Sequence, residues 1–253
     1  YYEKAIKEYD YEGFKKLGDI YKKYDPKDHT KALETYKQGI TNINCLFSIG
    51  KLYEKGHGVQ QDYSEAKKHY ELCTHHNHSI AYFKLGYFYE YGLGVQKDYK
   101  EAIKNYELSS KLNNSKALYR MGVFLYNGDI IEANIPKAIE YFLKCSLIPA
   151  RYKERHDTLD YFYEIEFNSN RCYDISLNNL GLINLIEYNE PEVAYDYFKK
   201  AEFYPYCTSN IGLFYYLYKN NIERAEYYLQ QSSRNNFTLA YFNLGLIKED
   251  KKE

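Results

Sequence analysis

The chain has 253 residues, of which 34 are basic and 35 acidic, so that its formal charge is −1. This balance provides no general attraction for nucleic acid or for an anionic membrane. No apolar run reaches the roughly 18 residues that a membrane-spanning helix needs, and no secretory or transit segment is visible. We therefore expect neither nucleic-acid binding nor membrane insertion.

An apolar residue followed by glycine recurs along the chain, which indicates an internal repeat. We call the apolar residue the anchor, and the helix predicted around it helix A. The glycines stand 32, 36, 36, 59, 31 and 33 residues apart, and the one long spacing fits one period plus about 23 inserted residues. The dipeptides are Leu17-Gly18, Ile49-Gly50, Leu85-Gly86, Met121-Gly122, Leu180-Gly181, Ile211-Gly212 and Leu244-Gly245.

A second set of positions predicts a further helix in each unit, helix B. Alanine recurs at Ala32, Ala66, Ala102, Ala138, Ala194 and Ala225. A larger apolar residue stands four positions later, on the same helical face: Tyr36, Tyr70, Tyr106, Phe142, Phe198 or Leu229. Four positions before each alanine lies Asp28, Asp62, Asp98, Asn134, Glu190 or Asn221. Asp and Asn, which hold five of these six positions, favour a helix N-cap.

In chain order, the spacing predicts an all-α array in one domain. A partial unit occupies residues 1–10, where Ala5 and Tyr9 match helix B, so we expect further residues upstream of Tyr1. Units follow at 11–42, 43–78, 79–114, 115–146, 174–204 and 205–236, with a partial unit at 237–253. Residues 147–173 are an insertion that we expect to form an extra helix, the alternative being a longer helix B and a loop.

The third unit carries the clearest motif. It reads Ala81-x-x-x-Leu85-Gly86-x-x-Tyr89-x-x-Gly92-x-Gly94-Val95-x-x-Asp98-Tyr99-x-x-Ala102-x-x-x-Tyr106. This motif resembles the Sel1-like repeat, a relative of the tetratricopeptide repeat. The resemblance implies a right-handed α-solenoid of antiparallel helix pairs, a non-catalytic protein-interaction scaffold or adaptor, and a concave groove lined by one stripe of helix A.

The helix-A stripe consists of the positions two residues before the anchor and two, five and six residues after it. Aromatic and aliphatic side chains fill much of it, and exposed patches of this kind mark contact sites. We predict that a protein or peptide partner binds Phe47, Lys51, Phe83, Tyr87, Tyr91, Tyr119, Val123, Tyr126, Leu182 and Leu185. The alternative is that these rings pack against neighbouring units. Self-association through the apolar C-terminal part of the groove is a further possibility.

The chain has five cysteines, an odd number, and the repeat positions that hold four of them face residues other than cysteine. These four are Cys45, Cys73, Cys145 and Cys207. We interpret them as buried thiols in a cytoplasmic or other reducing compartment. A secreted or host-directed effector with the same scaffold is the alternative function, and the host cell cytoplasm would then be its location.

One turn contains three histidines, His75, His76 and His78, two residues after Cys73. Imidazole and thiolate are zinc ligands, which makes this turn the one candidate centre for a metal-binding or enzymatic protein. The segment aligns with a plain turn of the next unit, so we interpret it as solvated. No nucleophile elbow or phosphate-binding loop is present, and we expect no cofactor and no enzyme.

Overall fold

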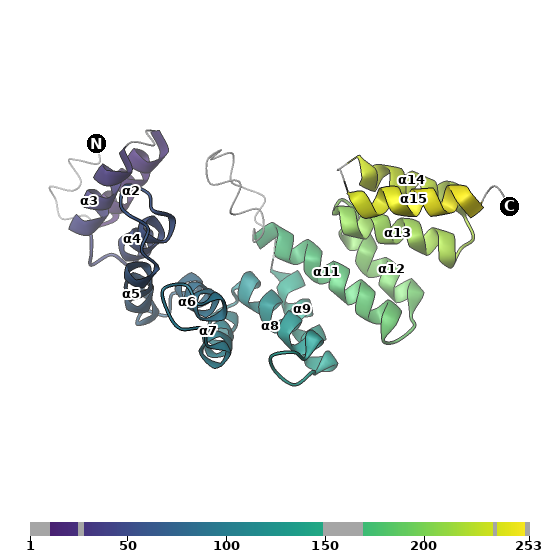
Figure 1. Ribbon diagram of the computed structural model, residues 1–253, viewed down its shortest axis with the longest axis horizontal. Helices are drawn as coiled ribbons and strands as arrows, with labels where there is room; N and C mark the ends of the chain where they lie inside the picture. Colours follow the sequence, from purple (N-terminus) through teal and green to yellow (C-terminus); the bar gives the residue numbers. More distant parts are fainter. Residues whose placement is uncertain (1–10, 25–27, 149–168, 235–236, 251–253) are drawn as a thin grey trace. The chain divides into compact units, whose positions relative to one another are not determined.

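The computed structural model describes residues 11–24, 28–148, 169–234 and 237–250. Within these residues the chain forms thirteen α-helices and no strand (Figure 1). The all-α class is therefore confirmed. None of these helices is long and apolar enough to cross a bilayer.

The helices alternate between the two predicted kinds. Every anchor lies in a helix A: α2 (Tyr11–Tyr24), α4 (Ile43–Lys55), α6 (Ser79–Tyr91), α8 (Ser115–Asn127), α11 (Ser169–Ile186), α13 (Pro205–Leu217) and α15 (Thr238–Asp250). Every recurring alanine after Ala5 lies in a helix B: α3 (His29–Gln38), α5 (Tyr63–Thr74), α7 (Tyr99–Lys111), α9 (Ile135–Leu147), α12 (Pro191–Lys200) and α14 (Ile222–Ser233).

The described residues fall into two compact units. The first contains α2 to α7, α8 as far as Phe124, and Asp129–Ile131. Of the described residues, the second contains the last turn of α8, Gly128, residues 132–148, and the helices from α11 to α15. The expected extra helix lies outside the described residues, and α11 begins at Ser169, inside the predicted insertion.

Each helix pair is antiparallel, as the pair α6 and α7 shows. The Ser109 hydroxyl near the end of α7 donates to the Ser79 carbonyl at the start of α6, at 2.7 Å. Tyr106, one turn earlier in α7, donates to the Glu90 carboxylate near the end of α6, also at 2.7 Å. The two helices therefore run in opposite directions along each other.

A ring from helix B lies directly on the glycine of helix A. A Cβ added at Gly86 would lie 2.7 Å from Cδ1 of Tyr106, and one added at Gly50 would lie 2.7 Å from Cε1 of Tyr70. No real Cβ tolerates such distances, so glycine is required for this approach. The five rings, and Leu229 at the equivalent position of α14, are each at most 1% exposed.

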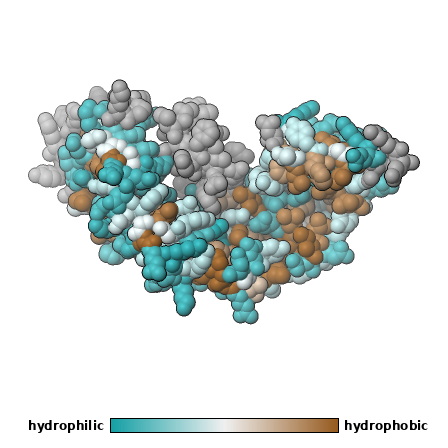
Figure 2. All heavy atoms as spheres, viewed as in Figure 1, coloured by the Kyte–Doolittle hydropathy of each residue, from teal (hydrophilic) through white to brown (hydrophobic). Residues whose placement is uncertain are grey.

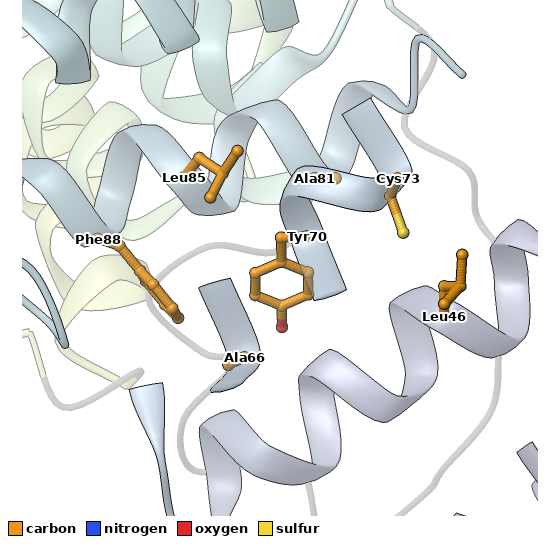
Figure 3. Close-up of a cluster of buried hydrophobic side chains, with 7 residues drawn as sticks. All are labelled: Leu46, Ala66, Tyr70, Cys73, Ala81, Leu85 and Phe88. Carbon is orange, nitrogen blue, oxygen red and sulfur yellow. The ribbon is translucent and has the colours of Figure 1, made fainter. Parts of the chain in front are cut away.

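The core continues from one pair of helices to the next (Figure 3). Tyr70 and Ala66 of α5 form one cluster with Leu46 of α4 and with Leu85 and Phe88 of α6. The rings of Tyr70 and Phe88 meet edge to face at 5.7 Å. Because each helix B packs against helices A of two successive repeats, no single repeat buries its apolar face alone.

Four of the six helices B have an N-cap side chain that accepts hydrogen bonds from backbone N–H groups of the first turn, as the sequence predicts. Asp62 accepts hydrogen bonds from the backbone N–H groups of Ser64 and Glu65, and Asp98 caps α7 in the same way. Asn134 and Asn221 each accept one such bond. The prediction is wrong for Asp28, whose side chain forms no cap hydrogen bond. Glu190, the one position without Asp or Asn, forms none either. Asp28 instead forms an ion pair with Lys31 at 3.0 Å.

The loop between helices A and B needs glycine for two reasons. Gly92 ends α6 with φ +70°, a left-handed conformation that L side chains disfavour. Gly94 has φ +64°, and a Cβ there would lie 2.7 Å from the backbone at Tyr63 and Ser64. The loop therefore contacts the first turn of α5, the helix B of the preceding repeat.

All five cysteines are free and buried, as we predict. The Cys73 thiol at the end of α5 faces the Ile43 carbonyl at the start of α4, at 3.7 Å. Burial raises the pKa of Cys45 to about 11 and the pKa of Cys73 to about 12. These thiols therefore stay protonated and unreactive near neutral pH.

The contact between the helix-B ring and the helix-A glycine can be tested by replacing the glycine with alanine in two different repeats. Gly86→Ala should destabilise the protein by about 1–3 kcal/mol because the methyl collides with Tyr106. Gly245→Ala should stabilise it by about 0.5–1 kcal/mol, since no described atom outside its chain neighbours and its own helix backbone lies within 4 Å of a Cβ added there. Thermal melting followed by circular dichroism measures both, and equal shifts of the same sign would contradict the assigned packing.

The register of helix B can be tested at Ala102, which is fully buried. Ala102→Leu should overpack the contact between α6 and α7 and cost about 1–3 kcal/mol. Lys104→Leu places the same side chain on the exposed face of α7 and should change stability by less than about 0.5 kcal/mol. If both substitutions lower the melting temperature equally, the register is wrong.

The cysteine assignment predicts a simple chemical result. At pH 8 a thiol reagent such as dithionitrobenzoate should label less than one thiol per native molecule, because burial both shields these groups and raises their pKa. After unfolding in guanidinium chloride it should label all five. Rapid labelling of the native protein would show that a cysteine is accessible.

Candidate functional site

The helix-A stripe lines a cavity in the first unit. The cavity encloses about 320 Å³ between α2, α4 and the start of α6. The predicted residues Phe47 and Lys51 line it, as does Lys55 one turn later in α4. We call it the lysine cavity.

Three further residues of the lysine cavity come from α2 and are not among the predicted contact residues. They are Lys15, Asp19 and Lys22. They stand two residues before Leu17 and two and five residues after it, which are stripe positions. Counting the stripe positions from the anchor Leu17 would have predicted these residues.

Packing holds Phe47 in place at the base of the lysine cavity. Its ring stacks on His78 at 4.6 Å and lies 5.3 Å from the ring of Tyr70. The Tyr36 ring also lines the cavity, and its hydroxyl donates to Asp19 at 2.7 Å. Burial and the Asp19 carboxylate raise the pKa of Tyr36, so this hydroxyl stays protonated.

The predicted aromatic residues of α6 divide into packed and exposed rings. Phe83 is only 5% exposed, and its ring lies 5.6 Å from that of Tyr106. The alternative of packing within the array therefore holds for Phe83, which offers a partner little surface. Tyr91 is 51% exposed and lies 4.5 Å from the half-buried ring of Tyr87. This pair remains available as a contact surface.

The three predicted contact residues of α8 are half-buried. Tyr119 and Val123 belong to the first unit. Tyr126 belongs to the second, where its hydroxyl lies 3.5 Å from the Glu187 carboxylate. Burial, followed by this carboxylate, raises the pKa of Tyr126.

The stripe of the second unit is aliphatic. Leu182 and Leu185 are half-buried. Leu185 lines a small cavity of about 60 Å³ with Leu213 and Leu217, the last of which is 63% exposed. On the face drawn in Figure 2, hydrophobic residues gather over α11 to α13, whereas α2 to α5 are mainly hydrophilic.

Two acidic stripe residues link successive repeats and leave little surface for a partner. Glu54 of α4 accepts from the Tyr70 hydroxyl of α5 and pairs with Lys84 of α6 at 2.6 Å. Glu90 of α6 likewise accepts from Tyr106 and pairs with Arg120 of α8. Glu90 is 6% exposed, so its charge is satisfied inside the array.

The histidine turn has a structural role. His75 ends α5, and the His78 side chain accepts from the Ala81 backbone N–H at the start of α6, at 3.1 Å. Burial lowers the pKa of His78, which favours the neutral form that can accept this bond. In the described ranges no group of three or more His, Cys, Asp or Glu side chains could hold a metal ion, and this includes the histidine turn.

Comparison with known proteins agrees with this architecture. The Sel1 repeat family model matches residues 43–72, 79–114, 115–144 and 210–237. One curated relative is the ERAD-associated E3 ubiquitin-protein ligase component HRD3 of Candida glabrata, 35% identical over 82 residues. That match covers 32% of this chain and only 10% of HRD3.

Two solved structures share the fold. A Sel1 repeat protein from Oxalobacter formigenes has a TM-score of 0.70 at 21% identity, covering 91% of this chain and 86% of that one. The protein c5321, a protective antigen of uropathogenic Escherichia coli, has a TM-score of 0.50 at 18% identity, covering 96% of this chain and 58% of that one. The helix pairs and the glycine contacts agree with the four matched stretches, and the chain is built with repeats of the Sel1 type.

Proposed function

We propose that this chain is a non-catalytic scaffold that binds a segment of a partner protein along its helix-A stripe. Sel1 repeat proteins generally mediate protein–protein interactions, and the family is typically non-catalytic. The observation that carries the proposal is the exposed Tyr91 ring beside Tyr87 on a helix whose other face is fully packed.

Tyrosine at these positions suits a protein interface for physical reasons. Its ring offers a large apolar area, its hydroxyl can form a hydrogen bond, and only two side-chain torsions lose freedom on binding. The stripe carries no arrangement that would activate a nucleophile. The charged groups of α4 and α6 that are buried, such as Glu90, are committed to links between repeats.

One comparison supports an assembly role. HRD3 is described as a component of a ubiquitin ligase, that is, of a larger complex. The shared segment is a small part of HRD3, so we propose only the general role of holding proteins together. The partner is expected to be a polypeptide, and we propose no cofactor.

The double variant Tyr87→Ala/Tyr91→Ala tests the scaffold. It should reduce the amount of a captured partner about tenfold, which corresponds to the loss of about 1.4 kcal/mol of binding energy. The melting temperature should stay near that of the wild type because Tyr91 is half exposed. Affinity capture from the source organism with quantitative mass spectrometry measures the loss.

Tyr227→Ala is the matched control, since Tyr227 is 57% exposed, meets the neighbouring Tyr228 ring edge to face and lies on helix B, outside the stripe. It should retain the partner. Equal loss in the control would remove the stripe from the interface. Reduced melting with normal binding per folded molecule would show that Tyr87 and Tyr91 are core residues.

A further inference from the structure

The aliphatic stripe of the second unit ends in two exposed side chains. Ile186 and Leu217 stand six residues after the anchors of α11 and α13, and they are 65% and 63% exposed. The same stripe position holds Lys55, Tyr91 and Asn127 in the three repeats that begin with α4, α6 and α8. Large apolar side chains exposed at the same position of two neighbouring repeats mark a contact surface.

A cavity of about 60 Å³ lies between α11, α12 and α13, and we call it the leucine cavity. Leu185, Leu213 and Leu217 line it together with Pro191 and Tyr218. Its volume is far below the roughly 300–1,000 Å³ of small-molecule pockets. The leucine cavity therefore suits part of one side chain of a larger partner better than a complete small molecule.

Acidic residues lie next to the residues that line the leucine cavity. Glu190 and Glu192 flank Pro191 in the chain, and Glu187 follows Leu185 by two positions. All three carboxylates belong to exposed residues. The connection between α11 and α12 therefore presents three carboxylates beside an apolar surface.

Only one of these carboxylates has a cationic partner among the described residues. Glu192 pairs with Lys219 at 2.5 Å. Glu187 lies 3.5 Å from the Tyr126 hydroxyl, which is neutral because its pKa is raised by burial and by this carboxylate. Glu190 begins α12, and its side chain forms no cap hydrogen bond. The three carboxylates and the one ammonium group therefore carry a formal charge of −2.

This combination of negative charge and apolar surface favours a basic partner over other occupants. The carboxylates would repel an anionic membrane or a nucleic acid. A symmetric contact between two copies would place the patch against itself, so that the carboxylates of both copies faced each other. A basic segment instead gains ion pairs at the border of an apolar contact.

The arrangement of the two exposed side chains suits a helix. The helices α11 and α13 contact each other directly, since the Asn210 side-chain amide donates to Oδ1 of Asn178 at 3.0 Å. Neighbouring packed helices lie roughly 8–10 Å apart, and seven residues of an α-helix rise about 10 Å. Two apolar residues seven positions apart on one helix can therefore contact Ile186 and Leu217 together.

We propose that the leucine cavity, with Ile186 and Leu217 beside it, binds a basic amphipathic helix of the partner protein. One apolar side chain of that helix enters the cavity, and lysines or arginines next to it face Glu187 and Glu190. This inference rests on the proposed scaffold function and adds the chemistry of the bound segment. The apolar contact supplies affinity, while the carboxylates select the charge of the partner.

A synthetic peptide tests the proposal directly. The probe is a fluorescein-labelled helical peptide with leucines at positions i, i+3 and i+7 and lysines beside them, titrated with the full 253-residue chain and followed by fluorescence anisotropy. Replacing its lysines by glutamates, or its leucines by alanines, should weaken binding at least about tenfold. Salt should weaken the lysine probe because exposed charges are screened within about 10 Å at 0.1 M ionic strength.

Removing the exposed apolar side chains locates the contact. Ile186→Ser/Leu217→Ser should weaken the lysine probe at least about tenfold, a loss of 1.4 kcal/mol or more. The melting temperature should stay near that of the wild type because both side chains are mostly exposed. Ile40→Ser/Leu72→Ser is the matched control, since it makes the same two changes at residues that are 49% and 44% exposed in the first unit. It should leave binding within about twofold.

Charge reversal tests the role of the carboxylates. Glu187→Lys/Glu190→Lys should weaken the lysine probe about tenfold and strengthen binding of the glutamate probe. Glu34→Lys/Glu223→Lys is the matched control, because it makes the same change in net charge at exposed residues of α3 and α14 that do not border the cavity. It should leave the binding of both probes within about twofold.

Several results would overturn the proposal. Equal affinity for the lysine and glutamate probes would do so, as would equal losses in a variant and its matched control. Tighter binding to vesicles that contain phosphatidylserine would assign the surface to a membrane. A dimer that Ile186→Ser/Leu217→Ser converts to a monomer in sedimentation velocity would assign it to a second copy of the chain.

The experiments separate this inference from the scaffold function on which it rests. If the lysine probe fails to bind while Tyr87→Ala/Tyr91→Ala still loses its captured partner, the leucine-cavity assignment is wrong and the scaffold stands. If the probe binds as expected and that variant keeps its partner, the leucine-cavity assignment stands and the tyrosine contact is wrong.

Discussion

The contact between a helix-B ring and a helix-A glycine is the constraint on which this protein depends. At Gly86 the ring of Tyr106 occupies the volume that any side chain would fill. A glycine inside a helix destabilises it by roughly 1 kcal/mol relative to alanine. The packing of the ring against the glycine must therefore stabilise the fold by more than this amount. The Tyr106 ring is fully buried, and the equivalent side chains of the other helices B, Leu229 of α14 among them, also contribute buried apolar area.

The same ring also carries the polar link to the next repeat. The Tyr106 hydroxyl donates to Glu90, which pairs with Arg120, and Tyr70, Glu54 and Lys84 form the equivalent link one repeat earlier. Burying a carboxylate is costly unless it is paired and hydrogen-bonded. Each link therefore favours one register of a repeat against its neighbour. In solenoids, stability arises largely from such nearest-neighbour interfaces.

Because the packing uses fixed positions, the remaining stripe positions are free to differ between repeats. They are basic around Lys51, aromatic at Tyr87 and Tyr91, and aliphatic at Leu182 and Leu185. The repeat family therefore sets the scaffold, while the side chains along helix A set what it can bind. The basic portion is where the first unit forms a recess.

The sequence by itself determined the helix pairs, because glycine, alanine and ring positions recur at helical spacing and local caps mark where helices begin. It located the stripe but not the exposure of each residue in it. Phe83 and Tyr91 look equivalent as aromatic stripe residues, yet one is packed against Tyr106 and the other is half exposed. Only the tertiary structure decided this, and it also brought Lys15 and Lys22 beside the lysines of α4. Exposure and convergence depend on which helices lie next to each other, and sequence periodicity records only one helix at a time.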